Sequence, residues 1–471
     1  MNKQVPKSAD PSKQRYAGYY KHADRSAEVD TELTYTGPQT PMGEYMRRFW
    51  QSVCMSEELT EVPKAIRILG EDLVAFRDRS GRVGVLDRHC SHRGTSLEYG
   101  IIQQQGIRCC YHGWQFDVDG TILEMPCEPP ESRMKDNVFQ GAYPAFEREG
   151  LVFAYMGPPD EKPEFDEFDA YASPTDGRLV PFSNIYACNW LQVSENLIDH
   201  FHAATLHNNM TVESVDSEIV DGVSLGEGFR TMPMIHWEKT RDGNGMLFSA
   251  GRRIADDKAW VRITEMRFPN FVQTASVVPT AAELRHTTVG LTRWHVPVDD
   301  HNMIIYGWRH FNDEIDPKHT GDESECGIDK VDFLIGQTDH RTYLEGQRAP
   351  GDYEAITSIG KIAPHHLEHP GRSDVGVYMC RNLLRAAVRG ETPADSTRAA
   401  SIKAGDTLPA YSADSVLNVP RDEVDDNGLL QELCQQVVDI MKECDSVPSA
   451  ERKAHAHKRL NDIDGGAGAL L

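Results

Sequence analysis

The sequence predicts an α+β protein built from two units, and two patterns lead to that prediction. Residues 45–160 carry short alternating segments broken by turn residues, which indicates a small all-β unit. Residues 161–460 carry longer strand patterns and then helical ones, which indicates an antiparallel sheet with helices on one side. A chain of 471 residues is also too long for one ordinary core. We expect residues 1–44 to form an arm that adds a part to the larger unit, and residues 461–471 to form a flexible tail.

The strands of the smaller unit follow from apolar residues at every second position between turn signals. Asp119-Gly120 is a strong signal for a two-residue hairpin. The strands expected in this unit are Ile66–Leu69, Leu73–Arg77, Arg82–Asp87, Gln115–Val118, Thr121–Glu124 and Leu151–Met156.

The larger unit begins with a helical pattern that runs from Trp190 to His207. Helical composition returns after Phe333, and Leu429–Cys444 has apolar residues at helical spacing. The long strands expected between these helical regions are Trp260–Phe268, His286–Val296 and Met303–Phe311.

The charge balance excludes some classes of partner. Lys and Arg number 49 and Asp and Glu number 73, so the formal net charge is −24. A field of that sign repels phosphate backbones, which argues against nucleic acid. The chain has no apolar run long enough for a membrane helix, and Met1–Tyr20 has no apolar stretch typical of a secretory signal. We therefore expect a cytoplasmic protein.

Two short segments of the smaller unit predict a metal site. Cys90 and His92 are followed by Cys109 and His112 in the pattern C-x-H-x16-C-x2-H. Two thiolates and two imidazoles could hold a tetrahedral Zn²⁺. The same ligands could hold a [2Fe–2S] cluster, with the thiolates on one iron and the histidines on the other.

The surroundings of these ligands favour the iron–sulfur cluster. Zinc sites usually pair cysteines as C-x2-C, and neither segment does so. Gly94 and Gly113 follow the ligands and allow backbone N–H groups to approach bridging sulfides. Tyr111 and Trp114 can donate hydrogen bonds and exclude solvent, which tunes a cluster of this kind.

The helical segment of the larger unit predicts a second metal site. Asp199 and His202 are three residues apart and share a face of a helix. His202 and His207 are five apart, which leaves them about 140° from each other on a regular helix. They can share one metal only if the helix is irregular, and we expect that irregularity near Ala203–Leu206. His200 would lie on the opposite face, in a structural role.

Both patterns resemble those of the Rieske non-haem iron oxygenases. The two cysteine–histidine segments resemble the Rieske signature, although Ser91 and Cys110 stand where that signature usually has proline. The run E-N-x2-D-x2-H-x4-H resembles the mononuclear iron motif of the same family, and it matches at Glu195, Asn196, Asp199, His202 and His207. The resemblance covers about Leu33 to Leu384 and is nearest to the phthalate-dioxygenase-like branch.

The resemblance implies the remaining site residues. Asp352, within Gly351–Gly360, stands at the position of the third iron ligand, with Asp339, Glu354 and Asp374 as competitors. The catalytic residues that it implies are Asp199 and Asn196. Asp199 would bridge the iron to a Rieske cluster on a neighbouring subunit, or else only orient His202.

The implied protein is a terminal oxygenase with a small all-β Rieske domain and a helix-grip catalytic domain. It would use O₂ and electrons from a separate NAD(P)H-dependent reductase, with or without a ferredoxin, to mono- or dihydroxylate an aromatic substrate. Self-association as a trimer or as stacked trimers is implied too. Oxidative O- or N-dealkylation is an alternative, and a non-catalytic Rieske electron carrier or a zinc-stabilised ligand-binding protein are alternatives of other classes.

The substrate pocket is expected among the strands of residues 215–310, where the sequence does not fix which side chains face the iron. Five arginines of this region are expected to be surface or ion-pair residues: Arg252, Arg253, Arg262, Arg267 and Arg293.

Overall fold

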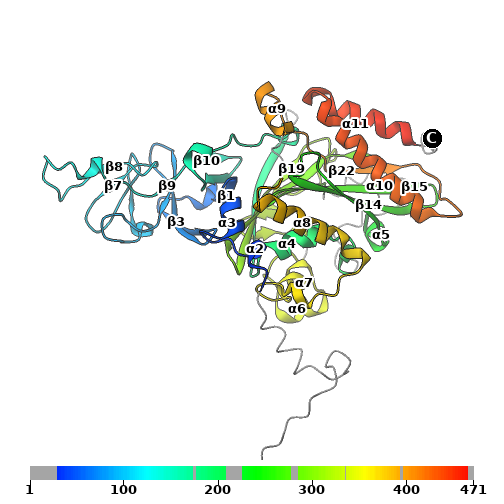
Figure 1. Ribbon diagram of the computed structural model, residues 1–471, viewed down its shortest axis with the longest axis horizontal. Coiled ribbons are helices and arrows are strands. Elements are labelled where there is room, and N and C mark those ends of the chain that lie inside the picture. The colour runs from blue at the N-terminus through cyan, green and yellow to red at the C-terminus, as the bar shows by residue number, and fades with distance from the viewer. Residues whose placement is uncertain are drawn as a thin grey trace, which may run out of the picture.

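A small β-domain and a larger sheet-and-helix domain lie side by side in the computed structural model (Figure 1). The helices that the model describes include none that is long and apolar enough to cross a membrane. The structure describes residues 29–172, 177–207, 225–276, 285–334, 336–392 and 396–464.

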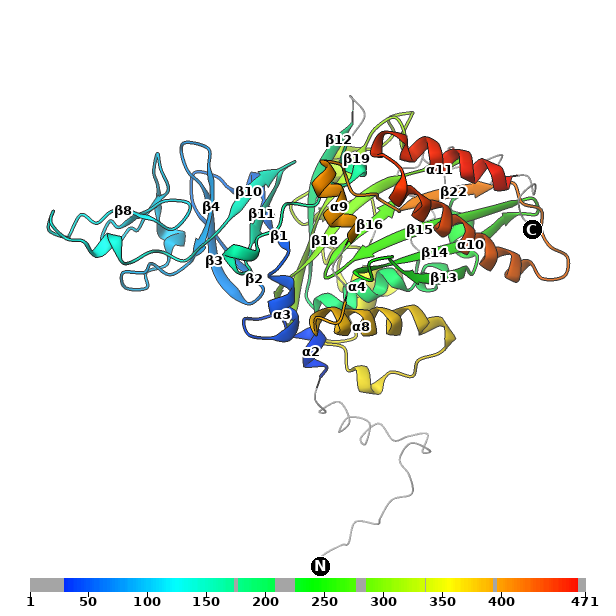
Figure 2. The ribbon, with the colours of Figure 1, turned by 45° about the horizontal axis from the view of Figure 1, so that its top comes forward.

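The small domain contains two four-stranded antiparallel sheets. One sheet has the order β2 (Lys64–Ile68), β3 (Glu71–Arg77), β4 (Val83–Asp87) and β9 (Ala142–Tyr143). The other has the order β5 (Ile101–Ile102), β6 (Ile107–Arg108), β7 (Gln115–Phe116) and β8 (Ile122–Glu124). A third sheet, β1 (Trp50–Met55), β11 (Leu151–Tyr155) and β10 (Ala145–Arg148), lies toward the larger domain (Figure 2). All six strands expected from the sequence have counterparts here.

Among the described residues, nine antiparallel strands form the sheet of the larger domain. Its main path has the order β12 (Arg178–Tyr186), β19 (Asn302–Phe311), β18 (Val289–Asp299), β16 (Phe271–Ala275), β15 (Lys258–Arg267), β14 (Gly245–Ala255) and β13 (Met234–Lys239). β22 (Ala413–Leu417) pairs with β15 and with β17 (His286–Thr287). A separate hairpin joins β20 (Cys326–Gly327) to β21 (Lys330–Val331).

Helices pack on both faces of this sheet, so the expectation of helices on one side is wrong. Alternate residues of a strand point to opposite faces. Leu247 of β14 packs in the core formed with α10 (Asp426–Glu443) and α11 (Ser449–Ile463), whereas its neighbours Met246 and Phe248 pack in the other core. That second core includes α4 (Trp190–Ile198) and α8 (Val375–Val388), which lie below the sheet in Figure 2. The remaining helices are α2 (Thr31–Thr34), α3 (Pro41–Met46), α5 (Leu225–Arg230), α6 (Tyr343–Arg348), α7 (Asp352–Thr357) and α9 (Ser396–Ala404).

A buried ion pair fixes α8 against α4. Arg381 of α8 donates to both carboxylate oxygens of Glu195 on α4, at 2.6 and 2.7 Å, and to those of Glu368 at 2.6 and 2.9 Å. Only 6% of the Arg381 side chain is exposed, so this bidentate pairing takes place away from bulk water. The pairing holds α4 in place, and the two histidines of the second predicted metal site come directly after α4 in the sequence.

Candidate metal centres and catalytic cavity

The two cysteine–histidine loops have the same backbone design. In the first loop the N–H of Gly94 donates to the carbonyl of Cys90 at 2.8 Å, and in the second the N–H of Gly113 donates to the carbonyl of Cys109 at 3.1 Å. Both glycines have positive φ, 77° and 76°, a conformation that glycine adopts without strain. The sequence therefore folds two separate segments into matching turns that present a cysteine and a histidine each.

The four donor side chains form a layered site. Cys90 and Cys109 are free thiols, each 3% exposed, and lie beside each other. Burial raises the pKa of the Cys90 thiol, while the backbone N–H groups of His92 and Arg93 act in the opposite direction by favouring the thiolate. The rings of His92 and His112 lie farther out, with centroids 4.5 Å apart. Inner thiols and outer imidazoles suit a [2Fe–2S] cluster with one iron of each kind.

The residues around these donors differ in what they do. Trp114 is buried and stacks on His92 at 4.6 Å, whereas Tyr111 is 60% exposed and lies against His112 at 3.8 Å. Cys110 is exposed, apart from the buried thiols. Gln140, which sequence reasoning missed, is buried and accepts from the Ser91 N–H at 2.8 Å. Its amide donates to the carbonyls of Asp87 and His89, so it braces the first loop from a distant segment.

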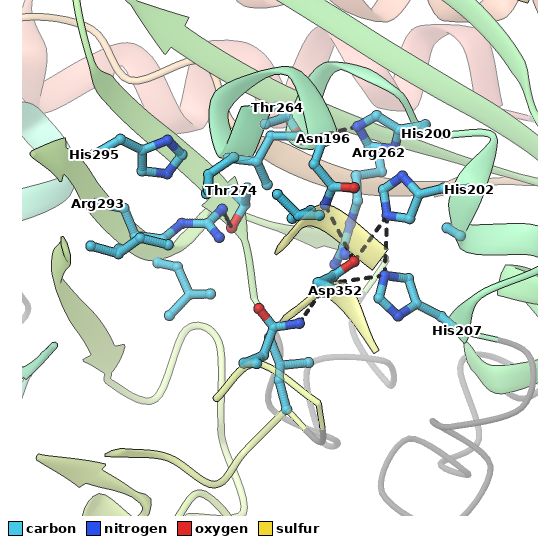
Figure 3. Close-up of a pocket in the computed structure, with 18 of the residues that line it drawn as sticks. Asn196, His200, His202, His207, Arg262, Thr264, Thr274, Arg293, His295 and Asp352 are labelled. Carbon is cyan, nitrogen blue, oxygen red and sulfur yellow. Dashed lines mark hydrogen bonds and ion pairs between the residues drawn. The ribbon is translucent and has the colours of Figure 1, made fainter. Parts of the chain in front are cut away.

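The second predicted metal site also comes together. His202 Nε2 lies 3.2 Å from His207 Nε2. The carboxylate of Asp352 reaches both rings, with Oδ1 3.6 Å from His202 Nε2 and Oδ2 3.6 Å from His207 Nε2 (Figure 3). Three donor atoms at these separations can share one metal ion that lies about 2 Å from each nitrogen. Two histidines and one carboxylate form the facial triad typical of non-haem iron.

The helix that carries the two histidines stops earlier than expected. The prediction placed a helix through His207 with an irregularity near Ala203–Leu206, whereas α4 ends at Ile198. Asp199 is extended, with φ −87° and ψ 93°, and a short 3₁₀ turn begins at His202. The α-helix therefore ends before His202. The residues between the two histidines form a 3₁₀ turn at His202–Ala204 followed by a further turn, so the irregularity expected near Ala203–Leu206 is present. This irregular backbone removes the 140° separation that a regular helix would impose between His202 and His207, which is why the two rings can face each other.

Asp352 is held by hydrogen bonds on both oxygens. Asn196 Nδ2 donates to Oδ1 at 3.2 Å and Gln337 Nε2 donates to Oδ2. Tyr186 in turn donates its hydroxyl to Gln337 Oε1 at 3.2 Å. Burial raises the pKa of Asp352, but His207, His202 and these donors together lower it below the usual value. The side chain is therefore a buried carboxylate prepared for a cation.

The competitors of Asp352 lie elsewhere. Glu354 accepts from Arg341 and from the backbone of Gly351. Asp374 accepts from the backbone of Gly371, and Asp339 is 64% exposed.

Gln337 carries a prediction, because it donates to the carboxylate of Asp352, the predicted third ligand, and nothing in the sequence marked it. We expect Gln337→Leu to lower iron affinity or turnover by about 10- to 100-fold, as is usual when an outer hydrogen-bond partner of a metal ligand is lost. Iron per chain and kcat measured at saturating Fe²⁺ would show this. Tyr186→Phe leaves the Gln337 amide in place, so it should lower iron affinity or turnover less than Gln337→Leu does. An equal or larger loss would contradict the proposed sequence of hydrogen bonds from Tyr186 through Gln337 to Asp352.

Asp199 faces away from the triad. Its backbone carbonyl accepts from His202 Nδ1, and its Oδ2 lies 3.8 Å from the same nitrogen. The side chain is 35% exposed and lines a surface depression of about 420 Å³, together with Glu368, Tyr378 and Arg381. One side of Asp199 thus contacts His202, a predicted iron ligand, and the other side opens to the surface.

A cavity of about 150 Å³ adjoins the triad. This is the size of a cavity that holds a single benzene ring. Its wall is mixed: aliphatic residues, among them Leu197, Leu291 and Ile305, and the aromatic residues Tyr186 and Phe229 alternate with polar ones. The polar residues that line it beyond the triad and its partners are Ser276 and six that Figure 3 labels: His200, Arg262, Thr264, Thr274, Arg293 and His295.

His200 corrects a prediction, because it lines this cavity instead of serving only a structural role. Its Nε2 lies 3.4 Å from Thr264 Oγ1. Burial, and then the charges of Arg252 and its neighbours, hold the pKa of His200 well below the usual value, so the ring is neutral. The prediction failed because the break after α4 changes which face each following residue presents.

Three of the five arginines are ion-pair residues, as expected. Arg253 pairs with Asp426 and Arg262 with Asp414; Arg267 pairs with Glu265. Among the described residues, Arg252 and Arg293 contact no carboxylate. Arg252 is fully buried against Phe229 and Trp260, with ring centroids 5.4 and 5.3 Å from its guanidinium carbon, and Arg293 lines the cavity. For these two the expectation is wrong.

Known proteins share both halves of this chain. The Rieske [2Fe-2S] domain family matches residues 49–144, and the family described as LigXa C-terminal domain like matches 154–324. The chain is 58% identical over 468 residues to the tert-butanol monooxygenase / tert-amyl alcohol desaturase oxygenase subunit of Aquincola tertiaricarbonis, a match that covers 98% of this chain and 99% of that protein. It is 34% identical to the phthalate 4,5-dioxygenase oxygenase subunit of Pseudomonas putida, covering 74% of this chain and 82% of that one.

A solved structure shares the fold. The crystal structure of dicamba monooxygenase bound to dicamba superposes with a TM-score of 0.51 at 16% identity, over 73% of this chain and 98% of that one. The motifs, the fold and the full-length similarity agree, and they decide for an enzyme over an electron carrier or a zinc-stabilised binding protein. The chain belongs to the Rieske non-haem iron oxygenases, as an oxygenase subunit of the phthalate-dioxygenase-like branch, and its cofactors are a Rieske [2Fe–2S] cluster and a mononuclear iron.

Proposed function

We propose that this chain is the terminal oxygenase of a system that hydroxylates or desaturates a small branched alcohol. The observation that carries the proposal is the end-to-end similarity, at 58% identity, to a relative named for tert-butanol and tert-amyl alcohol. The cavity supports it by its size, because a space of about 150 Å³ suits a branched molecule of four or five carbons, and its wall offers both aliphatic contacts and polar groups for a hydroxyl. The proposed substrate thus shifts from the aromatic compound expected from the sequence to an aliphatic alcohol.

The overall reaction balances with two electrons and two protons. Hydroxylation converts the alcohol and O₂ into a diol and water; desaturation converts them into an alkenol and two waters. Because the described residues include no nucleotide-binding motif, the electrons would come from a separate NAD(P)H-dependent reductase, with or without a ferredoxin. The iron supplies O₂ activation when it is bound.

Two sites in different domains would divide electron transfer and O₂ activation between them. Cys90, Cys109, His92 and His112 would hold the cluster. His202, His207 and Asp352 would hold the iron on one face and leave the other face open toward the cavity. Asn196 and Gln337 would keep the carboxylate of Asp352 directed at the metal.

Electron delivery would involve a neighbouring copy of the chain. The loops that carry the cluster ligands lie in the small domain, remote from the triad in the larger domain (Figure 1). Asp199 touches His202 and opens at the surface, where a histidine of an adjacent Rieske domain could reach it. A trimer or stacked trimers would supply that contact.

A small aromatic acid is the second candidate. The relative named for phthalate favours it, and a cavity of this size accepts a single ring.

Product analysis separates the two candidates. The purified oxygenase, a phthalate-type reductase and NADH would be supplied with tert-butanol, tert-amyl alcohol, benzoate or phthalate, and the product would be counted per O₂ consumed. We expect nearly one hydroxylated or unsaturated product per O₂ with the tertiary alcohols and little with the acids. Turnover of an acid, with only uncoupled O₂ consumption in the presence of the alcohols, would overturn the proposal.

A further inference from the structure

Arg293 is a cationic side chain in the wall of the cavity beside the triad. It lies on β18, where it pairs with Val272 of β16 and Gly307 of β19. Its guanidinium donates through Nη2 to Thr274 Oγ1 at 3.3 Å, and its Nε is buried and has no partner among the described residues. Figure 3 shows the guanidinium directed from the strand toward Thr274. The side chain remains partly accessible, and the space that it borders is the cavity.

Arg293 differs from a neighbouring arginine of the sheet in having no carboxylate partner. Arg262, on the next strand but one, is neutralised by two bonds to Asp414 at 2.8 and 2.7 Å. Arg293 contacts no carboxylate of the described chain. Burial lowers its pKa to about 10, so the group stays charged at neutral pH. A desolvated guanidinium with unused N–H groups is costly unless a ligand supplies an acceptor.

Arg293 and the triad line the same cavity, so a substrate held by Arg293 would lie in a fixed orientation toward the triad. The carboxylate of Asp352 is near enough to raise the pKa of Arg293 through its charge, although the two do not touch. Aliphatic side chains, among them Leu197, Leu291 and Ile305, line the same space. Arg293 with Thr274 and the predicted iron ligands thus occupy separate parts of a wall that also carries apolar side chains and further polar ones, among them Arg262 and His295.

We propose that Arg293, together with Thr274, binds the hydroxyl oxygen of the substrate and so turns the alkyl group opposite that hydroxyl toward the iron. This inference rests on the proposed function and names its specificity determinant. A substrate hydroxyl can accept from the guanidinium and exchange a hydrogen bond with Thr274 Oγ1, so it satisfies both partners. A carboxylate could accept from both partners as well, which is why the test below includes one.

The test compares substrates of equal shape. tert-Amyl alcohol and 2,2-dimethylbutane differ only in that a methyl group replaces the hydroxyl, and 2,2-dimethylbutanoate tests a carboxylate at the same place. Wild type is expected to prefer the alcohol to the alkane in kcat/KM. Arg293→Met should lower kcat/KM for the alcohol by about 10- to 100-fold, mainly through KM, and leave the alkane unchanged, because one charged hydrogen bond is lost. Arg293→Lys should restore part of the preference.

Controls separate binding from folding. Arg178→Met removes an arginine of the same sheet whose side chain is 67% exposed, and it should leave both substrates unaffected. Iron content and the visible spectrum should match wild type in every variant. An equal loss for alcohol and alkane in Arg293→Met, or an unchanged preference for the alcohol, would overturn the inference and leave the proposed function standing. If wild type instead oxidises the acid and no alcohol, the proposed function fails, and with it the hydroxyl assignment.

Discussion

Replacing His202 by alanine should remove the mononuclear iron and abolish oxygenation while the protein keeps its red-brown cluster. His202 Nε2 lies 3.2 Å from His207 Nε2 and 3.6 Å from Asp352, so it supplies one of three donors to a single site. The loss of an outer partner alone costs about 10- to 100-fold, and the loss of a ligand itself should exceed that. Iron and sulfide per chain, with product formation from the tertiary alcohol, are the measurements.

The control for this variant is His301→Ala, because His301 is exposed and lies outside both sites. It should keep full iron and full activity. If His202→Ala retains all of its iron and its activity, the triad is not the iron site.

Asp199→Asn is expected to suppress steady-state turnover by at least about 10- to 100-fold although both metal centres remain filled. The amide keeps the shape of the side chain but loses the negative charge and one acceptor oxygen. An electron path that links His202 to a histidine of a neighbouring copy requires that both oxygens accept hydrogen bonds. Reductase-driven turnover and iron content should be measured on the same preparation. Loss of turnover with full iron supports a bridge between subunits.

The same variant tests the alternative role of Asp199. If the residue only orients His202, iron affinity should fall together with turnover, and added Fe²⁺ should restore activity. Asp339→Asn, at a side chain that is 64% exposed, serves as the control and should behave as wild type.

The parts of the site that the sequence predicted are those encoded within a short segment. The two cluster loops and the pair His202 and His207 could be identified because their spacing is local. Asp352 lies about 150 residues farther along the chain, and only the resemblance to a family pointed to it. The strands of the small domain were predicted well because each is bounded by its own turn residues.

The parts that could not be predicted depend on how distant segments meet. Gln140, Gln337 and Arg293 act through partners on other elements, and their sequence neighbourhoods carry no motif. The end of α4 at Ile198 was missed because helical composition continues past it. Helix termination there depends on the packing of the following turn rather than on a glycine or a proline.

Iron and acid-labile sulfide, counted in the anaerobically purified protein, test the central claim that one chain holds two iron centres. The structure predicts about three irons and about two sulfides per chain, with a red-brown colour that bleaches on reduction with dithionite. A colourless protein that contains zinc and no sulfide after anaerobic reconstitution would contradict the cluster, and about two irons with two sulfides would contradict the triad.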